Sequence, residues 1–545
     1  MRKSSINFIF NAHLPFVRHP EYPKFLEEDW LFEATNESYL PLLRMMYGLR
    51  AEGTGFRLTF SISPTLGAML DDELLNTRFS AYLDERIELA DKEISRLSRD
   101  KQRKALAVFY KDELLANRSF YGEVCQGRIL NAFNTLSNEG CLELITTTAT
   151  HAYLPVYKDY PIAVNAQIET GVLEHIRHFD KMPEGFWLPE CGYYPGLEEM
   201  LRNHNIRWTS LGSQALVLSP DKCERGSYSP VKCPNGLYCF VRDVSLTSLV
   251  WSDTEGYPTD SVYRDFYRDI GFDLPFDYIK PYVHEPEVRS FTGFKYNAVT
   301  GRSADKDVYD RAKAAERVVS HAKNFLYNVR SRTENLNDLL DVDPVYTVSF
   351  DAELFGHWWY EGVSWLENII RMVWEDDSLS LITPSDFIAT KPEVQTLQPA
   401  TSSWGEGGYS AVWVDSSSNA WLYRHIFKAL ERMTELAERF PEQKSLKQRF
   451  LNQAARETLL LMASDWPFII HNQTSRDYAV QRLEGHIENL NLVYDNMCKN
   501  AVNTEWLVKA EKRDNLFRFI DYNIMNGKHL DEPSPIFTTD FTSEK

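Results

Sequence analysis

The chain has 545 residues, which is enough for two or three domains rather than one. Hydrophobic residues make up 43% and charged residues 25% of the sequence, the balance of an ordinary globular protein. The net charge of −19 opposes binding to a phosphate backbone, so we expect no nucleic-acid partner. The aromatic content of 13% favours aromatic-lined binding surfaces, although large cores also use such residues.

The N-terminal residues and the cysteines indicate the cellular compartment in which the protein is expected. The apolar run in residues 1–17 is interrupted by two asparagines and lacks a small-residue cleavage site, so no signal peptide is expected. No uncharged apolar run reaches about 18 residues, which predicts no membrane span and no membrane partner. Seven cysteines without CxxC spacing indicate a reduced, cytoplasmic protein. Cys223, Cys233 and Cys239 cluster in sequence, but this spacing gives only weak support for a zinc site or a disulfide.

The N-terminal part of the chain predicts a strand and then helices. Residues 6–10 (INFIF) read as a buried strand that runs directly into the segment containing His13. Polar residues at the C-terminal ends of strands are where barrel active sites are built, but His13 could equally be a turn residue before Pro15. Residues 27–49 and 76–99 have the apolar spacing of helices with charged outer faces.

Two further strands also end in polar residues. Residues 141–155 predict a strand followed by His151, and a second histidine after a second strand is better evidence for a site than one alone. Residues 185–196 predict a strand that stops at Pro189, because proline cannot donate to an interior ladder. Glu190 comes next, among aromatic residues that should partly desolvate it and raise its pKa. Such perturbed carboxyl groups are candidate catalytic groups.

The stretch from residue 345 to residue 362 is the most informative in the chain. A β-branched and aromatic run predicts a buried strand, and Asp351 and Glu353 share one face if the strand continues that far. His357 and two adjacent tryptophans, Trp358 and Trp359, follow. Carboxylates can act at an acetal while indole faces stack on sugar rings, so this stretch predicts a carbohydrate site. The alternative, a strand ending in a solvated loop, gains nothing from two adjacent tryptophans.

Other segments predict a lid, a helix and an aromatic loop. Residues 197–250 are rich in Pro, Gly, Ser and Cys, which is typical of an insertion that forms a lid over a barrel site. Residues 305–330 predict a helix before the central strand. Residues 393–415 are loop-like, and the Gly-rich flanks of Trp404 and Trp413 favour a surface platform over core packing.

The C-terminal part predicts helices. A helical pattern extends from residue 416 to residue 525 and is clearest over 445–463 and 478–502. The tail from residue 531 is expected to be loosely ordered.

Taken together, these motifs resemble glycoside hydrolase family 57, and in particular its α-1,4-glucan branching enzymes and amylase-like members. Five segments carry the resemblance in the family's order: AHLPFVRHPE (12–21), LELITTTATHAYLP (142–155), GFWLPECGYYPG (185–196), SFDAELFGHWWYEG (349–362) and SSWGEGGYSAVWVD (402–415). The similarity continues through ASDWPFII (463–470), so it covers nearly the whole chain.

The resemblance implies an α/β architecture built on a distorted (β/α)7 barrel. The barrel is expected in residues 1–190 and 252–372, with an inserted lid domain in residues 191–251. An all-helical C-terminal domain in residues 373–530 would complete the glucan cleft, followed by the tail 531–545.

The resemblance also implies a retaining mechanism, with Glu190 as the nucleophile and Asp351 as the general acid/base. Retention requires two carboxyl groups about 5–5.5 Å apart, one ionised and one protonated, and closely spaced acids split their pKa values in this way. Glu353 is expected to support them rather than to be a third catalyst, and no metal or other cofactor is implied. The candidate substrate-binding residues are His13, His151, Trp251, Arg264, Trp358, Trp404, Trp413 and Asp465.

The predicted function is 1,4-α-glucan branching by a monomer that acts on an α-glucan such as amylose or glycogen. Glu190 would cleave an α-1,4 bond and hold the chain covalently, and an acceptor 6-hydroxyl deprotonated by Asp351 would take it. The same two acids would serve an intracellular α-amylase if water were the acceptor, or a 4-α-glucanotransferase if a 4-hydroxyl were. A non-catalytic glucan-binding protein is disfavoured because both acids are present.

The lid bears on the choice of acceptor. The family's branching enzymes carry a lid tyrosine that is thought to keep water from the glycosyl intermediate, and Lys232 stands at that position here. This departure favours the amylase alternative, whereas the overall motif match favours branching. Tyr228 or Tyr238 could take the place of the missing tyrosine.

Overall fold

The computed structural model describes residues 3–284, 288–301 and 305–530, so the predicted tail lies outside the described residues. The chain forms two compact units. The first comprises Met1–Phe60, Met69–Leu144 and Asp243–Phe387, and the second comprises Ser61–Ala68, Ile145–Arg242 and Ile388–Lys545. These units cut across the predicted domains, because the predicted barrel contributes to both of them.

A parallel sheet of buried strands organises the first unit. Strand β1 (Ser4–Ala12) pairs in parallel with β8 (Val345–Asp351) and with β9 (Leu379–Leu381). Side chains on both faces of β1, such as Phe8 and Ile9, are fully buried, as is usual for parallel sheets covered on both sides. The register places Asn11 opposite Asp351, so the polar ends of two strands meet as the sequence predicts.

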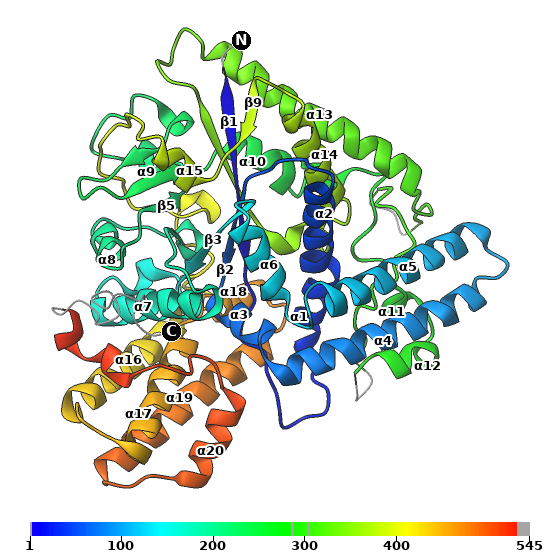
Figure 1. Ribbon diagram of the computed structural model, residues 1–545. Helices are drawn as coiled ribbons and strands as arrows, with labels where there is room; N and C mark the ends of the chain where they lie inside the picture. The colour runs from blue at the N-terminus through cyan, green and yellow to red at the C-terminus, as the bar shows by residue number, and fades with distance from the viewer. Residues whose placement is uncertain (1–2, 285–287, 302–304, 531–545) are drawn as a thin grey trace. The chain divides into compact units, whose positions relative to one another are not determined.

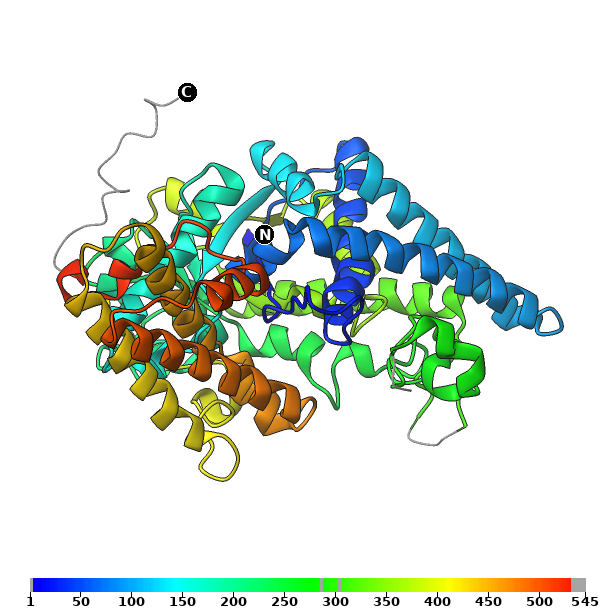
Figure 2. The ribbon, with the colours of Figure 1, turned by 90° about the horizontal axis from the view of Figure 1, so that it is seen from below.

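Helices account for most of the rest of this unit. The long helices α4 (Glu73–Arg96) and α5 (Lys101–Glu123) run side by side (Figure 1, Figure 2). Asp72 and Asp100 cap them by accepting hydrogen bonds from the backbone N–H groups of the first turn. The other helices of this unit are α1 (Glu28–Ala34), the π-helical turn η1 (Thr35–Tyr39), α2 (Leu40–Ala51), α6 (Ile129–Asn138), α10 (Val244–Trp251), α11 (Ile270–Asp273), α12 (Phe276–Ile279), α13 (Arg311–Asn335) and α14 (Gly362–Trp374). Four elements span the points where the chain passes between the units, namely β2 (Leu58–Ile62), α3 (Pro64–Leu70), β3 (Leu142–Thr147) and α15 (Pro384–Ala389).

The second unit contains its own run of parallel strands. Strand β3 pairs with β4 (Gly185–Trp187), β4 with β5 (Trp208–Leu211), and β5 with β7 (Tyr238–Val241), all in parallel. The two-residue strand β6 (Val231–Lys232) pairs with β7 in the antiparallel direction. Helices α7 (Pro161–Phe179), α8 (Leu197–Asn203) and α9 (Gln214–Val217) accompany these strands.

This arrangement differs from the predicted lid domain in residues 191–251. Strands β5 and β7 continue the pairing that begins at β4, and α10 belongs to the first unit. The excursion is therefore confined to residues 212–237, between β5 and β7. Four-residue strands bounded by turn residues leave too short a pattern to be recognised within a Pro- and Gly-rich stretch.

The C-terminal part of the second unit is helical, as predicted. It contains α16 (Tyr423–Arg439), α17 (Ser445–Leu461), α18 (Asp465–Asn472), α19 (Arg476–Cys498) and α20 (Thr504–Arg513), and α17 packs against α16, α19 and α20 (Figure 1). The helices predicted over 445–463 and 478–502 are confirmed as α17 and α19. Among the described residues, no helix is both long enough and apolar enough to cross a membrane.

Candidate active site

Glu190 lies on a strained turn directly after strand β4. Residues Pro189–Cys191 form a 3-10 turn, and both Glu190 (φ 61°) and Cys191 (φ 50°) have left-handed backbone conformations. Each such residue costs on the order of 1–3 kcal/mol and persists only where the surrounding structure enforces it, as at active sites. The sequence carries no signal of this strain, since neither residue type favours it.

Trp404 holds Glu190 from both the backbone and the side chain. The backbone N–H of Trp404 donates to the carbonyl oxygen of Glu190 at 2.8 Å, and the indole Nε1–H donates to Oε2 at 2.5 Å. The Glu190 side chain is 17% exposed, so its carboxylate is held by hydrogen bonds but remains accessible from solvent. A donor on one oxygen suits an ionised carboxylate that must attack with the other.

His151 approaches the same carboxylate from the end of β3. Its backbone is also left-handed (φ 53°), and its ring is buried. His151 Nδ1 lies 3.8 Å from Glu190 Oε1 and 3.0 Å from the Ser464 hydroxyl. Asp465 follows Ser464 as the first residue of α18 and is half-buried. The second unit therefore brings together Glu190, His151, Trp404 and the step from Ser464 to Asp465, residues that come from four separate motifs.

Trp413 corrects the expectation of a surface platform. Its side chain is only 2% exposed, and its ring stacks on Tyr153 with 4.8 Å between centroids. The Tyr153 hydroxyl in turn bonds to the Ser410 hydroxyl at 2.8 Å. The Gly-rich flanks led us to expect an exposed Trp413 side chain. Gly405 instead lets the loop pack closely on the indole, because a Cβ at this position would lie 2.5 Å from a Trp413 ring atom. Only Trp404, which is half-buried, retains the expected open face.

Asp351 and Glu353 are less alike than their spacing suggests. Strand β8 ends at Asp351, which is half-buried and accepts a 3.3 Å hydrogen bond from the Asn11 side chain. Glu353 lies in the following 3-10 turn, η7 (Ala352–Leu354), so the strand does not continue to it as predicted. Its Oε1 accepts hydrogen bonds from the Tyr39 hydroxyl and, at 3.2 Å, from the backbone N–H of His13. This N–H ties the half-buried His13 segment to the end of β8.

The protonation state of Glu353 follows from this environment. Burial and the Asp351 charge raise the pKa of Glu353 to about 8, and hydrogen bonds from Tyr39 and from the backbone N–H groups of Glu353 and His13 only partly offset them. Glu353 is therefore a neutral carboxylic acid at neutral pH, which agrees with a supporting rather than a catalytic role.

A second buried carboxyl, Glu37, behaves in the opposite way. His357 Nδ1 lies 2.8 Å from Glu37 Oε2. Burial raises the pKa of Glu37, but the hydrogen bond and charge of His357, with the charges of Lys295 and Arg264, together lower it to about 2. Gly356 (φ 104°) allows this approach, because a Cβ there would lie 1.9 Å from the Glu37 carbonyl oxygen. No local motif marks Glu37 or Tyr39 in the sequence, because both lie on an ordinary helical turn.

The two adjacent tryptophans have different environments. Trp358 is 52% exposed and stacks on Phe266 with 4.3 Å between ring centroids, which suits the predicted sugar contact. Trp359 is 1% exposed and packs against Trp365 and Tyr263, so it is a core residue. The prediction that both indoles serve a sugar site is therefore wrong for Trp359.

The two remaining candidate substrate-binding residues of the first unit, Trp251 and Arg264, differ in exposure. Trp251 ends α10 with 46% of its surface exposed, as a binding residue requires. Arg264, in contrast, is buried, with its guanidinium 3.8 Å above the Tyr360 ring and its backbone N–H bonded to Glu361. The structure places Arg264 inside the unit rather than at an open surface, and its contact with a glucan stays a prediction.

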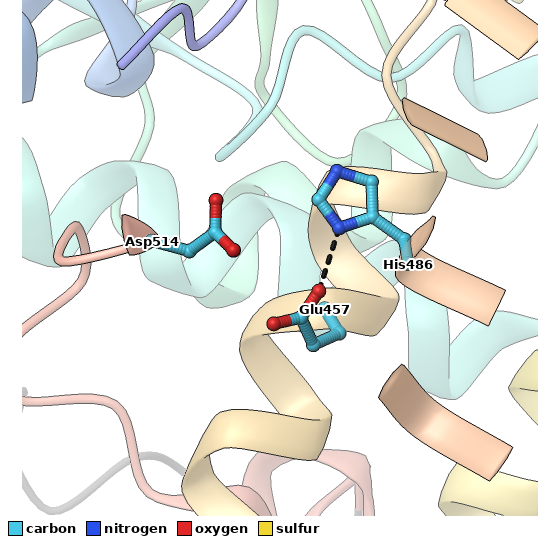
Figure 3. Close-up of side chains that lie close together, drawn as sticks. All are labelled: Glu457, His486 and Asp514. Atoms are coloured by element: carbon cyan, nitrogen blue, oxygen red, sulfur yellow. Dashed lines mark hydrogen bonds and ion pairs between the residues drawn. The ribbon is translucent and has the colours of Figure 1, made fainter. Parts of the chain in front are cut away.

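One group of three possible metal ligands occurs among the described residues: Glu457, His486 and Asp514 (Figure 3). His486 Nδ1 lies 2.6 Å from Glu457, and Arg513 lies 2.8 Å from Asp514 and 3.6 Å from Glu457. Although burial raises the pKa of Glu457, His486 and Arg513 lower it below its ordinary value. The two carboxyl groups thus already have His486 and Arg513 as partners, so we interpret the group as a buried polar network joining α17, α19 and the end of α20.

Comparison with known proteins decides the family. The pattern of glycosyl hydrolase family 57 matches residues 7–399 of the chain. The chain belongs to this family. The pattern described as "1,4-alpha-glucan branching enzyme, C-terminal" matches residues 425–525, which contain α16 to α20. The protein is thus an enzyme of glycosyl hydrolase family 57, and the resemblance seen in the five motifs is confirmed.

Individual relatives extend across the whole chain. A 1,4-α-glucan branching enzyme of Thermococcus kodakarensis is 29% identical over 98% of this chain and 79% of its own length. The crystal structure of an α-amylase of Thermotoga maritima has a TM-score of 0.90 and 40% identity, covering 96% of this chain and 99% of that one. A family 57 branching enzyme of Pyrococcus horikoshii has a TM-score of 0.87 and 29% identity, covering 98% of each chain. These likenesses confirm the predicted fold class, a distorted (β/α)7 barrel with a helical C-terminal region.

Proposed function

We propose that the protein is a retaining 1,4-α-glucan branching enzyme that transfers a segment of an α-1,4-glucan to a 6-hydroxyl group. The clamped carboxylate of Glu190, on a strained turn beside His151, supports glycosyl chemistry at this carboxyl group. The match of residues 425–525 to the C-terminal region of branching enzymes carries the choice of reaction, because the acids alone do not select an acceptor.

In the first step, the Glu190 carboxylate attacks the anomeric carbon while Asp351 gives its proton to the departing glycosidic oxygen. The α-1,4 bond breaks, and an ester bond joins the donor chain to Glu190. In the second step, Asp351 takes the proton of an acceptor 6-hydroxyl, whose oxygen displaces Glu190 and forms the α-1,6 bond. Both acids end in their starting protonation states. The distance of about 5–5.5 Å between the two carboxyl groups of retaining enzymes is what this mechanism requires.

Other candidate residues would bind the glucan. His13, His151 and Asp465 offer hydrogen-bonding groups for sugar hydroxyls, and Trp404, Trp358 and Trp251 keep exposed ring surface for stacking. Trp413 would act through Tyr153, on which it stacks, rather than by direct stacking on the sugar.

An α-amylase is the second candidate, and two observations favour it. The Thermotoga maritima α-amylase structure is 40% identical, compared with 29% for the Pyrococcus horikoshii branching enzyme. In addition, Lys232 stands where branching enzymes carry the lid tyrosine, and its Nζ lies 5.9 Å from the centroid of the Tyr238 ring. Tyr238, its cross-strand partner, is the residue best placed to substitute.

Incubation of the purified protein with amylose separates the two candidates. Proton NMR would follow α-1,6 linkages while a reducing-end assay follows hydrolysis, with Glu190→Gln as the inactive control. We expect new α-1,6 linkages with few new reducing ends. Reducing ends that rise without an α-1,6 signal would contradict branching and identify an α-amylase.

A further inference from the structure

Two buried cysteines face each other on the β6–β7 hairpin. The Sγ atoms of Cys233 and Cys239 are 3.6 Å apart, and both residues are fully buried. Cys239 pairs with Val231 across the hairpin, and Cys233 lies two residues beyond Val231, so both thiols project to the same face.

The hairpin backbone fixes this approach. The Cys233 N–H donates to the Leu237 carbonyl at 2.8 Å, and the Gly236 N–H donates to the Cys233 carbonyl at 2.9 Å. Gly236 takes a left-handed conformation (φ 91°) to close the turn. Cys223, the third cysteine of the sequence cluster, instead has its Sγ 3.6 Å from the Gly226 carbonyl oxygen. The three cysteines therefore resolve into one facing pair and one separate thiol.

The pair also adjoins the segment that holds Glu190. Lys232 on β6 makes backbone hydrogen bonds of 2.9 and 3.0 Å to Gln395 and Leu397, and the side chain of the next residue, Gln398, donates to the Tyr193 hydroxyl at 2.9 Å. The Tyr193 backbone pairs with Ser402 through bonds of 2.9 and 3.1 Å, two residues before Trp404. The hairpin that carries the two cysteines is therefore linked by hydrogen bonds to Tyr193, which lies three residues after Glu190.

We propose that Cys233 and Cys239 form a modification site at which a peroxide closes an intrachain disulfide, fastening β6 to β7 beside Lys232 and Tyr193. In the first step, the sulfur of one deprotonated cysteine attacks a peroxide oxygen, the O–O bond breaks, and a sulfenic acid and water form. The second sulfur then attacks the sulfenic sulfur, the S–O bond breaks, and a second water leaves as the S–S bond forms. Two thiols lose two hydrogens, and hydrogen peroxide is reduced to two waters.

The reaction at this site is slow at neutral pH. The hydrogen bond with Cys233 and then burial raise the pKa of Cys239 well above its ordinary value, and thiolates rather than thiols attack peroxides. Exposed Cys498 reacts first, so the test uses the variant Cys498→Ser. The rate of disulfide formation rises with pH as the thiols ionise.

Trypsin offers a direct readout on the full chain. Cleavage after Lys232 and Arg242 releases residues 233–242, CPNGLYCFVR, which contain both cysteines and no other basic residue. After treatment with hydrogen peroxide and alkylation under denaturing conditions, we expect this peptide unalkylated and lighter than its reduced form by two hydrogen atoms. Dithiothreitol should restore both alkylated cysteines.

Two results would overturn the proposal. One is a peptide that remains alkylated at both positions after prolonged oxidation, and the other is a peptide that gains oxygen atoms instead of losing hydrogens. The variant Cys239→Ser is the matched control, because it retains Cys233 but cannot close the bridge. The peptide around buried Cys125 serves as an internal reference for a thiol that stays reduced.

The effect on activity rests on the proposed function. A fastened β6–β7 hairpin should exclude water better, so the ratio of new reducing ends to new α-1,6 linkages should fall on oxidation and recover with dithiothreitol. An unchanged ratio in protein whose disulfide is shown by mass would contradict this coupling. A lack of α-1,6 product from the reduced protein would instead contradict the proposed function, and the disulfide readout is independent of both.

Discussion

Glu37 and Glu353, two carboxyl groups of the first unit, share burial but differ in charge. The hydrogen bond and charge of His357, together with the positive charges of Lys295 and Arg264, lower the pKa of Glu37 to about 2, so Glu37 is ionised. Burial and the like charge of Asp351 raise the pKa of Glu353 to about 8, because its hydroxyl and backbone N–H donors only partly offset them, and Glu353 is therefore neutral at pH 7. The charged neighbours of these two carboxyl groups, rather than burial itself, therefore decide which of them is ionised.

The largest effect on activity is expected from substitution of Asp351, the proposed acid/base next to Glu353. Asp351→Asn keeps the shape of the side chain but removes the transferable proton, so kcat on amylose should fall by about 10²–10⁴-fold. Added azide should partly restore turnover of an activated glycosyl donor, because azide attacks the glycosyl–enzyme without help from a general base. Wild-type turnover in this variant would remove Asp351 from the acid/base role.

Glu37→Gln should cause the largest loss of stability. The change removes a buried negative charge that faces His357, Lys295 and Arg264, and breaking a buried ion pair costs about 3–5 kcal/mol. Urea unfolding at pH 7 measures the loss, with Glu52→Gln as a control at a solvent-exposed ion pair with Arg371. Equal stability of the two variants would mean that Glu37 is not held as an ion.

The matched variant Glu353→Gln should differ from the wild type only as pH rises. In the wild type, the raised folded pKa means that the stability contribution of neutral Glu353 is fully present below pH 4.5 and is lost as pH rises from 4.5 to about 8. The amide cannot ionise, so the variant should gain stability relative to wild type across this window.

The stability contribution of Glu37 should change with pH in the opposite direction to that of Glu353. Its lowered folded pKa makes its contribution present above pH 4.5, and this contribution is lost as pH falls from 4.5 to about 2. Stability measured from pH 2 to pH 8.5 should therefore show Glu37→Gln converging on the wild type as pH falls below 4.5, and Glu353→Gln gaining on the wild type as pH rises above 4.5. Curves that run parallel to the wild type over both windows would contradict the two pKa shifts.

Tyr39→Phe should give the smallest effect. It removes one hydrogen bond to Glu353 Oε1 while leaving the His13 N–H in place, for a loss of about 0.5–1.5 kcal/mol. Because the Tyr39 bond lowers the pKa of Glu353, its removal should move the Glu353 titration to higher pH. Infrared difference spectroscopy of the carboxylic acid band measures this shift, and a move to lower pH would contradict it.

Local patterns predicted the elements that bear the site. Strands ending near His13, His151, Glu190 and Asp351 are visible in sequence because apolar runs stop abruptly at polar residues. The family resemblance, rather than periodicity, assigned the roles of nucleophile and acid/base. The C-terminal helices were equally visible, since long amphipathic segments carry the strongest periodic signal.

What the sequence missed depends on contacts between distant segments. Glu37 and Tyr39 are ordinary helix residues until folding brings them to the end of β8. Trp358 and Trp359 are indistinguishable in sequence, although only Trp358 remains exposed. The strands β5 and β7 are too short to stand out from the turns around them, which is why residues 191–251 resembled a separate lid.

Covalent trapping of the glycosyl–enzyme tests most directly whether Glu190 is the nucleophile. A 5-fluoroglycosyl fluoride of α-glucan configuration, which forms the intermediate faster than it breaks down, would be incubated with the protein and followed by tryptic mass mapping. We expect one added sugar on the peptide of residues 182–202, attached at Glu190, and no adduct in Glu190→Gln. A sugar attached to any other carboxylate, or stoichiometric labelling of Glu190→Gln, would contradict it.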